Sequence, residues 1–199
     1  MKHIVDMENL QDRFNEIVIS EEWEALEKDF IAAKHILIIG NGGNLSIADH
    51  AAIDISRLTD KNAICPGSGI CATSIISDNS FEVWFKKWVE FRMRGIDPKD
   101  VLILGLSCSV AGASSSSIIN AMKNAAADGA KCHLICAQEK KDKINDINFI
   151  NQDVVYYHTS EVLSTMLFYQ LIHCAGFKCP SIKGKDAQRQ KEVKDLEGR

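Results

Sequence analysis

The strongest constraint on the fold is a pair of continuous apolar runs, each of which ends in small polar residues before a helical pattern begins. Residues 35–39 read HILII and run into the glycine-rich segment 40–43. Residues 101–106 read VLILGL and run into the serine-rich segment 107–117. Runs that are apolar on both faces are typical of central parallel strands, because helices cover both sides of such a sheet. The two runs therefore predict an open parallel sheet.

The rest of the pattern supplies further elements of the same architecture. We expect helices over residues 10–34, 44–57 and 160–175, an aromatic-rich helix after Phe81, a helix that ends at Asp128, and strands over residues 72–77, 131–137 and 153–158. The predicted fold class is α/β, a three-layer sandwich of the flavodoxin-like kind with a central parallel sheet of about five strands and an added N-terminal helix. Residues 1–182 are expected to form one domain, and residues 183–199 a polar tail that is either a solvated helix or frayed.

The composition argues against several classes of function. The chain has 199 residues, of which 46% are hydrophobic and 25% charged, as in an ordinary globular protein. A net charge of −4 gives no electrostatic reason to expect direct binding of nucleic acid. No apolar run approaches the roughly 20 residues of a membrane-spanning helix, and no signal-peptide pattern is visible. We therefore expect a soluble protein with no membrane partner.

The cysteines indicate a reducing compartment. There are seven, an odd number, and none forms a C-x-x-C pair. Without a signal peptide, this usage predicts free thiols in the cytoplasm. Cys132, His133 and Cys136 are close in sequence, but their segment reads as a buried strand, in which neighbouring side chains point to opposite faces. We therefore do not interpret them as a metal site.

Two loops are the candidate binding elements, because ligands of open α/β sheets bind beyond the carboxyl ends of the strands. Glycines in segment 40–43 let the backbone approach a ligand closely, and Asn44 or Ser46 can cap the next helix. Hydroxyls and free N–H groups in segment 107–117 stand before a helix, whose N-terminus attracts anions. Each loop alone is also explained by an ordinary turn or cap. Together they favour a phosphate-type site.

A dinucleotide site fits the first loop less well. That fingerprint requires a third glycine where this chain has Leu45, and the lysine of a phosphate-binding P-loop is absent as well. We therefore expect no nucleotide cofactor.

A second group of polar residues falls on predicted helices. His50 and Asp54 are four residues apart and share one helix face, one turn below the glycine loop. A carboxylate with histidines can move a proton next to a carbonyl and stabilise an enediolate. An alternative is that Asp54 pairs with Arg57 at i,i+3. His50 can equally be a hydrogen-bonded helix residue. His173, on the predicted helix over residues 160–175, can equally be a core histidine whose hydrogen bonds are made within the fold.

Three segments carry a resemblance to a known family. GNGGNLSIADHAAIDISR resembles the first signature of the sugar isomerase (SIS) domain, specifically that of the sedoheptulose 7-phosphate isomerases, also called phosphoheptose isomerases. LGLSCSVAGASSSSIINAM resembles their second phosphate loop and the following helix, and residues 77–81 resemble a third, looser motif. The resemblance covers most of the chain, including the N-terminal helix that these proteins use in oligomers.

The resemblance implies roles for particular residues. Implied sugar-phosphate contacts come from both loops and one later position: Asn41, Gly42, Gly43, Asn44, Asp78, Ser107, Cys108, Ser109, Ser114 and Ser115. It assigns catalytic proton transfer to Asp54 and His173, and a metal site to His50, Asp54 and His173. Similar enzymes are homotetramers in which subunits complete one another's sites, and many bind zinc, so the implied cofactor is zinc.

Departures from the family pattern limit how far the function is carried over. Asp54 stands where the family has glutamate, Thr165 where it has glutamine, and Asn44 and Ile47 replace serine and aspartate. The serine loop is about three residues longer, with its glycine at position 112. The implied activity is isomerisation of a sugar phosphate, most simply sedoheptulose 7-phosphate to a heptose 7-phosphate. The alternative is a non-catalytic sugar-phosphate sensor or scaffold, like relatives that associate with the bacterial replication initiator.

The sequence also predicts self-association. The helix over residues 10–34 has more apolar positions than one face of a small sheet needs, and the family resemblance implies a tetramer. We expect sedimentation equilibrium to give the mass of a homotetramer at micromolar concentration. A monomer under those conditions would contradict this prediction.

Overall fold

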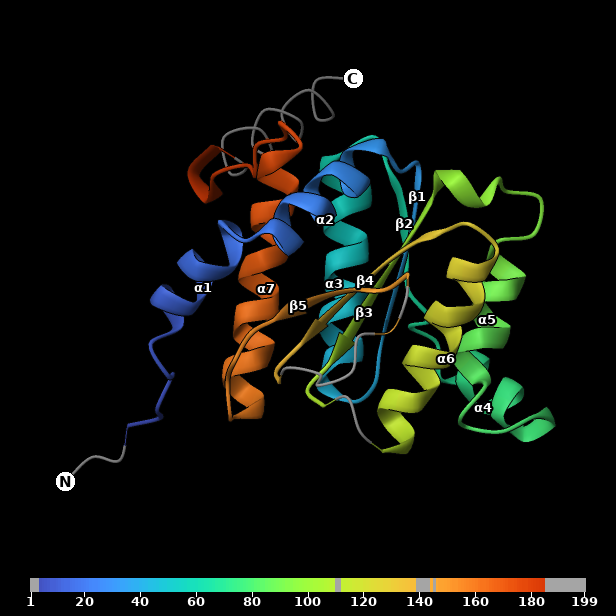
Figure 1. Cartoon of the computed structure of the whole chain (residues 1–199). Helices are drawn as coiled ribbons and strands as arrows, with labels where there is room; N and C mark the ends of the chain where they lie inside the picture. The colour runs from blue at the N-terminus through green and yellow to red at the C-terminus, as the bar shows by residue number, and fades with distance from the viewer. Residues whose placement is uncertain (1–3, 110–111, 139–143, 145, 185–199) are drawn as a thin grey trace, which may run out of the picture.

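The computed structural model describes residues 4–109, 112–138, 144 and 146–184, and it is built on one parallel sheet (Figure 1). The five strands lie in the order β2-β1-β3-β4-β5, and every neighbouring pair is parallel. They are β1 (His35–Gly40), β2 (Asn62–Ile64), β3 (Val101–Ser107), β4 (Lys131–Cys136) and β5 (Asn148–Asn151). This is the flavodoxin-like strand order. The predicted α/β class and parallel sheet are confirmed.

Helices cover both faces of the sheet (Figure 1). On one face lie α2 (Glu21–Ala32), α3 (Gly43–Leu58) and α7 (Tyr157–Cys174), with α1 (Leu10–Val18) against α7. The other face carries α4 (Gly69–Asp78), α5 (Trp84–Arg92) and α6 (Ala113–Ala127), and a short 3-10 turn, Pro98–Asp100, precedes β3. Two apolar clusters result, one on each face of the sheet.

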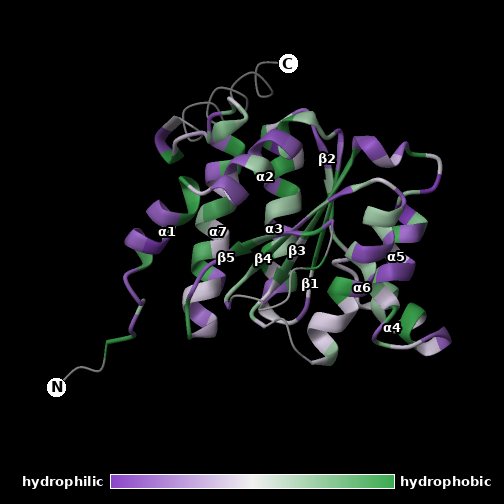
Figure 2. Ribbon diagram, in the orientation of Figure 1, coloured by the Kyte–Doolittle hydropathy of each residue, from purple (hydrophilic) through white to green (hydrophobic). Residues whose placement is uncertain are grey.

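The central strands are buried as their sequence predicts. Every residue of β3 is buried, and in β1 all but His35 are. Figure 2 shows the strands, largely green, between helices of mixed green and purple colour. Trp23 and Phe30 of α2 pack on one face, and Phe85 and Trp88 of α5 on the other. Burial on both faces explains why these strands read as unbroken apolar runs.

Two predicted strands are wrong. Residues 72–77 lie within helix α4. The edge strand next to β1 is β2, which has only three residues. Residues 153–158 are a loop and the first turn of α7, and the edge strand is β5. The sequences ATSIIS and DVVYYH are rich in β-branched or aromatic residues, so their local propensity favours a strand, but tertiary packing overrides it.

The predicted N-terminal helix is two helices. A break at Ile19 and Ser20 separates α1 from α2. The Ser20 hydroxyl accepts a hydrogen bond from the Trp23 backbone N–H at 3.2 Å, and acidic residues follow in the first turn of α2. Serine at an N-cap followed by acids is a helix start signal, so the sequence contained this boundary.

Two further predictions concern the polar C-terminal tail and membrane-spanning helices. Most of the predicted polar tail, residues 185–199, lies outside the described residues. In the part of the chain that the structure describes, no helix is long and apolar enough to cross a bilayer.

One buried histidine joins α2 to the sheet. His133 on β4 is 2% exposed; its Nε2 lies 2.8 Å from Asp29 Oδ2, and its Nδ1 lies 2.7 Å from the Asn148 amide nitrogen. The amide nitrogen is a donor, so Nδ1 accepts and Nε2 carries the hydrogen donated to Asp29. Burial lowers the pKa of His133, and this outweighs the opposing effect of Asp29.

This arrangement predicts acid sensitivity. Because the pKa of His133 is lowered in the folded state, the unfolded chain binds the proton more readily. The contribution of His133 to the free energy of unfolding is therefore complete above pH about 6.5 and is lost as the pH falls below that value. We expect the free energy of unfolding to decrease between pH 7.5 and 5.5, and His133→Gln to flatten that decrease. His35→Gln, at a partly exposed histidine, should keep the wild-type slope. If the free energy of unfolding falls equally steeply with pH in wild type and both variants, His133 is not the source of the acid sensitivity.

Candidate functional site

The two predicted loops lie side by side at the carboxyl edge of the sheet. The register of β1 against β3 pairs Gly40 with Leu106, so both strands end at the same level. Strand order reverses at this point, since β2 lies on one side of β1 and β3 on the other. Such switch points are where open α/β sheets bind ligands. A cavity of about 400 Å³ lies between the loops.

Nine of the ten predicted sugar-phosphate contacts line this loop cavity. They are Asn41, Gly42, Gly43, Asn44, Ser107, Cys108, Ser109, Ser114 and Ser115. The tenth, Asp78, is exposed at the end of α4 and does not belong to the described lining.

Side chains from one loop hold the other in place. The Asn41 amide donates to the Ser114 carbonyl at 2.8 Å and to Ser117 Oγ at 3.1 Å. The Asn44 amide lies 3.3 Å from Cys108 Sγ. These contacts join the start of α3 to β3 and α6, so the cavity wall is fixed by the protein itself before any ligand binds.

Three helices begin at this cavity. Helix α3 starts at Gly43, α6 at Ala113 and α7 at Tyr157, and the lining includes residues from the first turn of each. The first N–H groups of a helix have no partner within the helix and carry partial positive charge. No lysine or arginine occurs among the described lining residues. An anion here would therefore be held by backbone N–H groups and hydroxyls.

Four residues of this cavity were not predicted as contacts from the sequence. Leu106 and Ile118 are apolar residues of β3 and α6, and Tyr157 and Glu161 lie one turn apart on α7. A Cβ atom placed on Gly43 would lie 2.0 Å from Glu161 Oε1, so the carboxylate rests against the glycine loop. Glycine at position 43 leaves the space that Glu161 fills. An acid near a helix start was visible in the sequence, but its direction depends on how α7 docks, which local pattern does not encode.

The second predicted cluster forms on the faces of α3 and α7. Asp54 is buried, and its Oδ1 accepts from Arg57 Nη2 at 2.6 Å. Its Oδ2 accepts from the Tyr169 hydroxyl at 2.8 Å and lies 3.2 Å from His50 Nε2. Burial raises the pKa of Asp54, but the hydrogen bonds from Arg57 and Tyr169 prevail and hold it below its ordinary value. The Asp54–Arg57 pair considered from the sequence does form.

In a single chain this cluster is separate from the loop cavity. Asp54, His50 and Tyr169 border a small space of about 10 Å³, and its described lining shares no residue with the loop cavity. His173 is exposed on α7, one turn beyond Tyr169, so it is not a core residue. Within the described residues His173 has no hydrogen bond or ion pair with Asp54.

These residues do not fit the implied zinc ion within one chain. Both oxygens of Asp54 are engaged by other side chains. The Thr165 hydroxyl donates to the Glu161 carbonyl. Over the described ranges, no group of three or more His, Cys, Asp or Glu is arranged to hold a metal ion. Zinc binding at His50, Asp54 and His173 therefore stays a prediction that the single chain does not fulfil.

The fold and the loop cavity together define a flavodoxin-like α/β protein with a candidate anion site at its switch point. No protein-family model matches the sequence, and no curated protein matches it. Solved structures do match its fold. Phosphoheptose isomerase GmhA from Neisseria gonorrhoeae has a TM-score of 0.68 at 18% identity, with 85% of this chain and 92% of that chain covered.

Two further structures extend the comparison. A phosphoheptose isomerase from Francisella tularensis has a TM-score of 0.67 at 13% identity, covering 85% of this chain and 92% of that one. The NanR protein of Vibrio vulnificus complexed with ManNAc-6P has a TM-score of 0.55 at 15% identity, covering 92% of this chain and 65% of that one. The chain therefore has the fold of these proteins, and the predicted fold resemblance is confirmed.

The cavity geometry predicts anion binding that depends on the link between the loops. We expect inorganic phosphate to bind, and Asn41→Ala to weaken its affinity about fivefold or more, as loss of two hydrogen bonds of about 0.5–1.5 kcal/mol each implies. Isothermal calorimetry measures both. Asn62→Ala is the matched control, because Asn62 starts β2 at the opposite edge of the sheet. Equal weakening in both variants would contradict this placement of the site.

Proposed function

We propose that this chain is an aldose–ketose isomerase that acts on a phosphorylated sugar in the loop cavity, with Glu161 as the group that moves the proton. One observation carries the proposal. The Glu161 carboxylate lies against Gly43, inside a cavity whose other walls are glycine and serine loops at helix N-termini. A base and an anion site thus share one space of about 400 Å³, within the usual size of small-molecule pockets.

The phosphate end is assigned to the loops. Backbone N–H groups at the starts of α3 and α6, with the hydroxyl of Ser114, offer donors to the phosphate oxygens. The hydroxyls of Ser107 and Ser115 both donate to the Ser109 carbonyl, so they fix the shape of the serine loop. Donors fixed by a folded scaffold lose little freedom on binding, so they bind anions well without a lysine or arginine. The phosphate then anchors the sugar toward α7.

The reacting end is assigned to α7. An isomerase removes a proton from the carbon beside the carbonyl and returns it to the neighbouring carbon, by way of an enediolate. The Glu161 carboxylate accepts and returns that proton. Tyr157, one turn earlier on the same helix, also lines the cavity, and its hydroxyl is the proposed hydrogen-bond donor to the enediolate oxygen.

The particular substrate is proposed from the comparisons. Sedoheptulose 7-phosphate is supported by the likeness to two phosphoheptose isomerase structures and by the motifs around residues 40–57. We also propose a cytoplasmic homotetramer, on the same resemblance. The resemblance also implies that subunits complete one another's sites, so a residue from a further chain could join His50, Asp54 and His173. The role predicted for Asp54 and His173 is therefore tested directly.

Two isosteric substitutions separate the candidate bases. Glu161→Gln removes a proton acceptor from the cavity, so we expect kcat with sedoheptulose 7-phosphate to fall about 10²- to 10⁴-fold, while the Kd of inorganic phosphate changes little. Asp54→Asn should lower the melting temperature, because it weakens the contacts with Arg57, yet leave kcat within a few-fold. The reverse pattern would transfer the role of base to Asp54.

A steric variant tests the position of Glu161 without changing any charge. In Gly43→Ala the added methyl group occupies the place of the Glu161 carboxylate, so the Glu161 side chain must move. The backbone conformation at position 43 is one that alanine also adopts, so the chain itself is not strained. The proposal requires a loss of kcat in a folded protein here as well. Wild-type turnover in Gly43→Ala would count against Glu161.

The second candidate function is sugar-phosphate binding without turnover. It is favoured by the engagement of both Asp54 oxygens and by the fold shared with a protein complexed with ManNAc-6P. A panel of sugar phosphates distinguishes the two functions. Stabilisation of the fold by one member with no isomerisation of any would support the binding protein, since a ligand that binds the native state raises its stability.

A further inference from the structure

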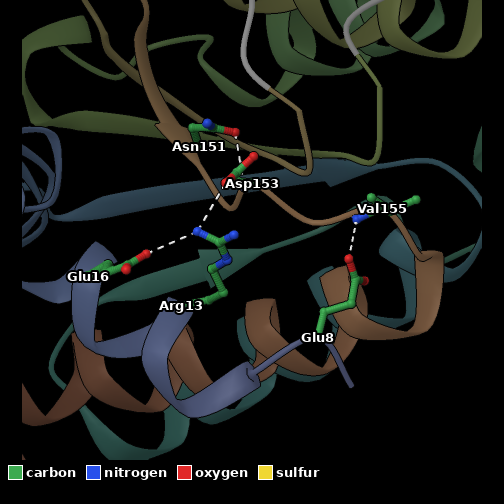
Figure 3. Close-up of polar contacts among 6 residues, drawn as sticks. All are labelled: Glu8, Arg13, Glu16, Asn151, Asp153 and Val155. Carbon is green, nitrogen blue, oxygen red and sulfur yellow. Dashed lines mark hydrogen bonds and ion pairs between the residues drawn. The ribbon is translucent and has the colours of Figure 1, made fainter. Parts of the chain in front are cut away.

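The N-terminal segment fastens the loop that leads into α7. Figure 3 shows Glu8 reaching the backbone at Val155 and Arg13 reaching Asp153. These contacts join residues about 140 positions apart in sequence. Residues 152–156 connect β5 to α7, so the segment holds the connection immediately before Tyr157 and Glu161. We call Glu8, Arg13 and Asp153 the N-terminal clamp.

Glu8 acts as a helix cap supplied from a distant part of the chain. Its Oε1 accepts from the Val155 N–H at 2.8 Å and its Oε2 from the Tyr156 N–H at 3.0 Å. Tyr156 is the N-cap residue of α7, and over the described residues its own side chain makes no cap hydrogen bond. A carboxylate at a helix N-terminus satisfies free N–H groups and complements the helix dipole. Burial raises the pKa of Glu8, but these hydrogen bonds prevail and lower it.

Arg13 provides an independent second contact. Its guanidinium lies 3.0 Å from Asp153 Oδ2 and 3.1 Å from Glu16 Oε2. The Asp153 backbone N–H in turn donates to Asn151 Oδ1 at 3.1 Å. The loop is thus held at its start by Arg13 and at its end by Glu8.

The backbone of the clamp is unusual on both sides. Glu8, Asn9 and Asp153 have φ values of 50°, 54° and 49°, in the left-handed region. Residues other than glycine rarely adopt this region, and they keep it where surrounding contacts fix it. The residues just before Glu8 are exposed, with Ile4 87% and Val5 60% accessible, whereas Glu8 itself is partly buried, so the polar contacts of Glu8 fasten the segment.

We propose that Glu8, supported by Arg13, is a positioning residue that sets the N-terminal turns of α7 and so holds Glu161 against Gly43 in the loop cavity. The proposal rests on the function assigned to Glu161 above. Glu161 follows the Glu8-bound N–H groups of residues 155 and 156 within two helical turns. Release of that end of α7 would move the carboxylate and leave the loops at β1 and β3 in place.

Glu8→Ala in the full-length protein is the test, with Asp12→Ala as its matched control. Asp12 is an acid in the first turn of α1 that makes no hydrogen bond or ion pair to residues 152–158 among the described side chains. We expect Glu8→Ala to lower kcat for sedoheptulose 7-phosphate about tenfold or more, since small misplacements of a catalytic group are costly. The Kd of inorganic phosphate should stay within about twofold, because the loops hold it.

A purely structural role would produce a different result. If Glu8 served only stability, kcat would be unchanged well below the melting temperature, or kcat and phosphate affinity would fall together. Either outcome overturns the proposal. Glu8→Gln keeps one carbonyl acceptor for one of the two N–H groups, so its kcat should lie between those of wild type and Glu8→Ala.

Hydrogen exchange keeps the test independent of turnover. Amides of residues 155–163 should exchange faster in Glu8→Ala than in wild type or Asp12→Ala, whether or not the protein isomerises any sugar phosphate. If wild type shows no turnover, the proposed function fails, and exchange alone decides whether the clamp exists. If these amides exchange in Glu8→Ala at the wild-type rate, Glu8 does not hold the start of α7 and the proposal is wrong.

Discussion

The burial of β1 and β3 on both faces is the constraint on which the rest of this structure depends. Strands apolar on both sides require helices on each face of the sheet, and parallel pairing requires a crossover between successive strands. All carboxyl ends then meet at one edge. Because β1 has β2 on one side and β3 on the other, the chain opens a crevice there, and the glycine and serine loops form its walls.

The proposed function places two groups that usually repel each other in the loop cavity. A phosphate and a general base are both negative, so placing them together needs compensating positive charge. In this proposal the compensation would come from the first turns of α3, α6 and α7, because the described lining holds no lysine or arginine. Gly43 sets how near the proposed base, Glu161, lies to the glycine loop, because any side chain at position 43 would occupy the place of the Glu161 carboxylate.

The two candidate carboxylates differ in their surroundings. Asp54 is a poor proton acceptor in the single chain, since Arg57 and Tyr169 stabilise its charged form and occupy both oxygens. Arg57 follows Asp54 by three residues, so this pair was foreseeable from sequence. Tyr169 is on another helix, and its contribution depends on the packing of α7 against α3.

The sequence by itself determined the α/β class, the central strands and nine of the residues that line the loop cavity, because long apolar runs and glycine or serine turns are local signals. It did not determine the short edge strands β2 and β5, since three or four residues carry little periodicity and tertiary packing overrode the propensities of residues 72–77 and 153–158. Tertiary structure alone brought Glu161 against Gly43 and Glu8 against the start of α7. Both contacts join positions more than 100 residues apart, and only the docking of helices on a completed sheet fixes such distances.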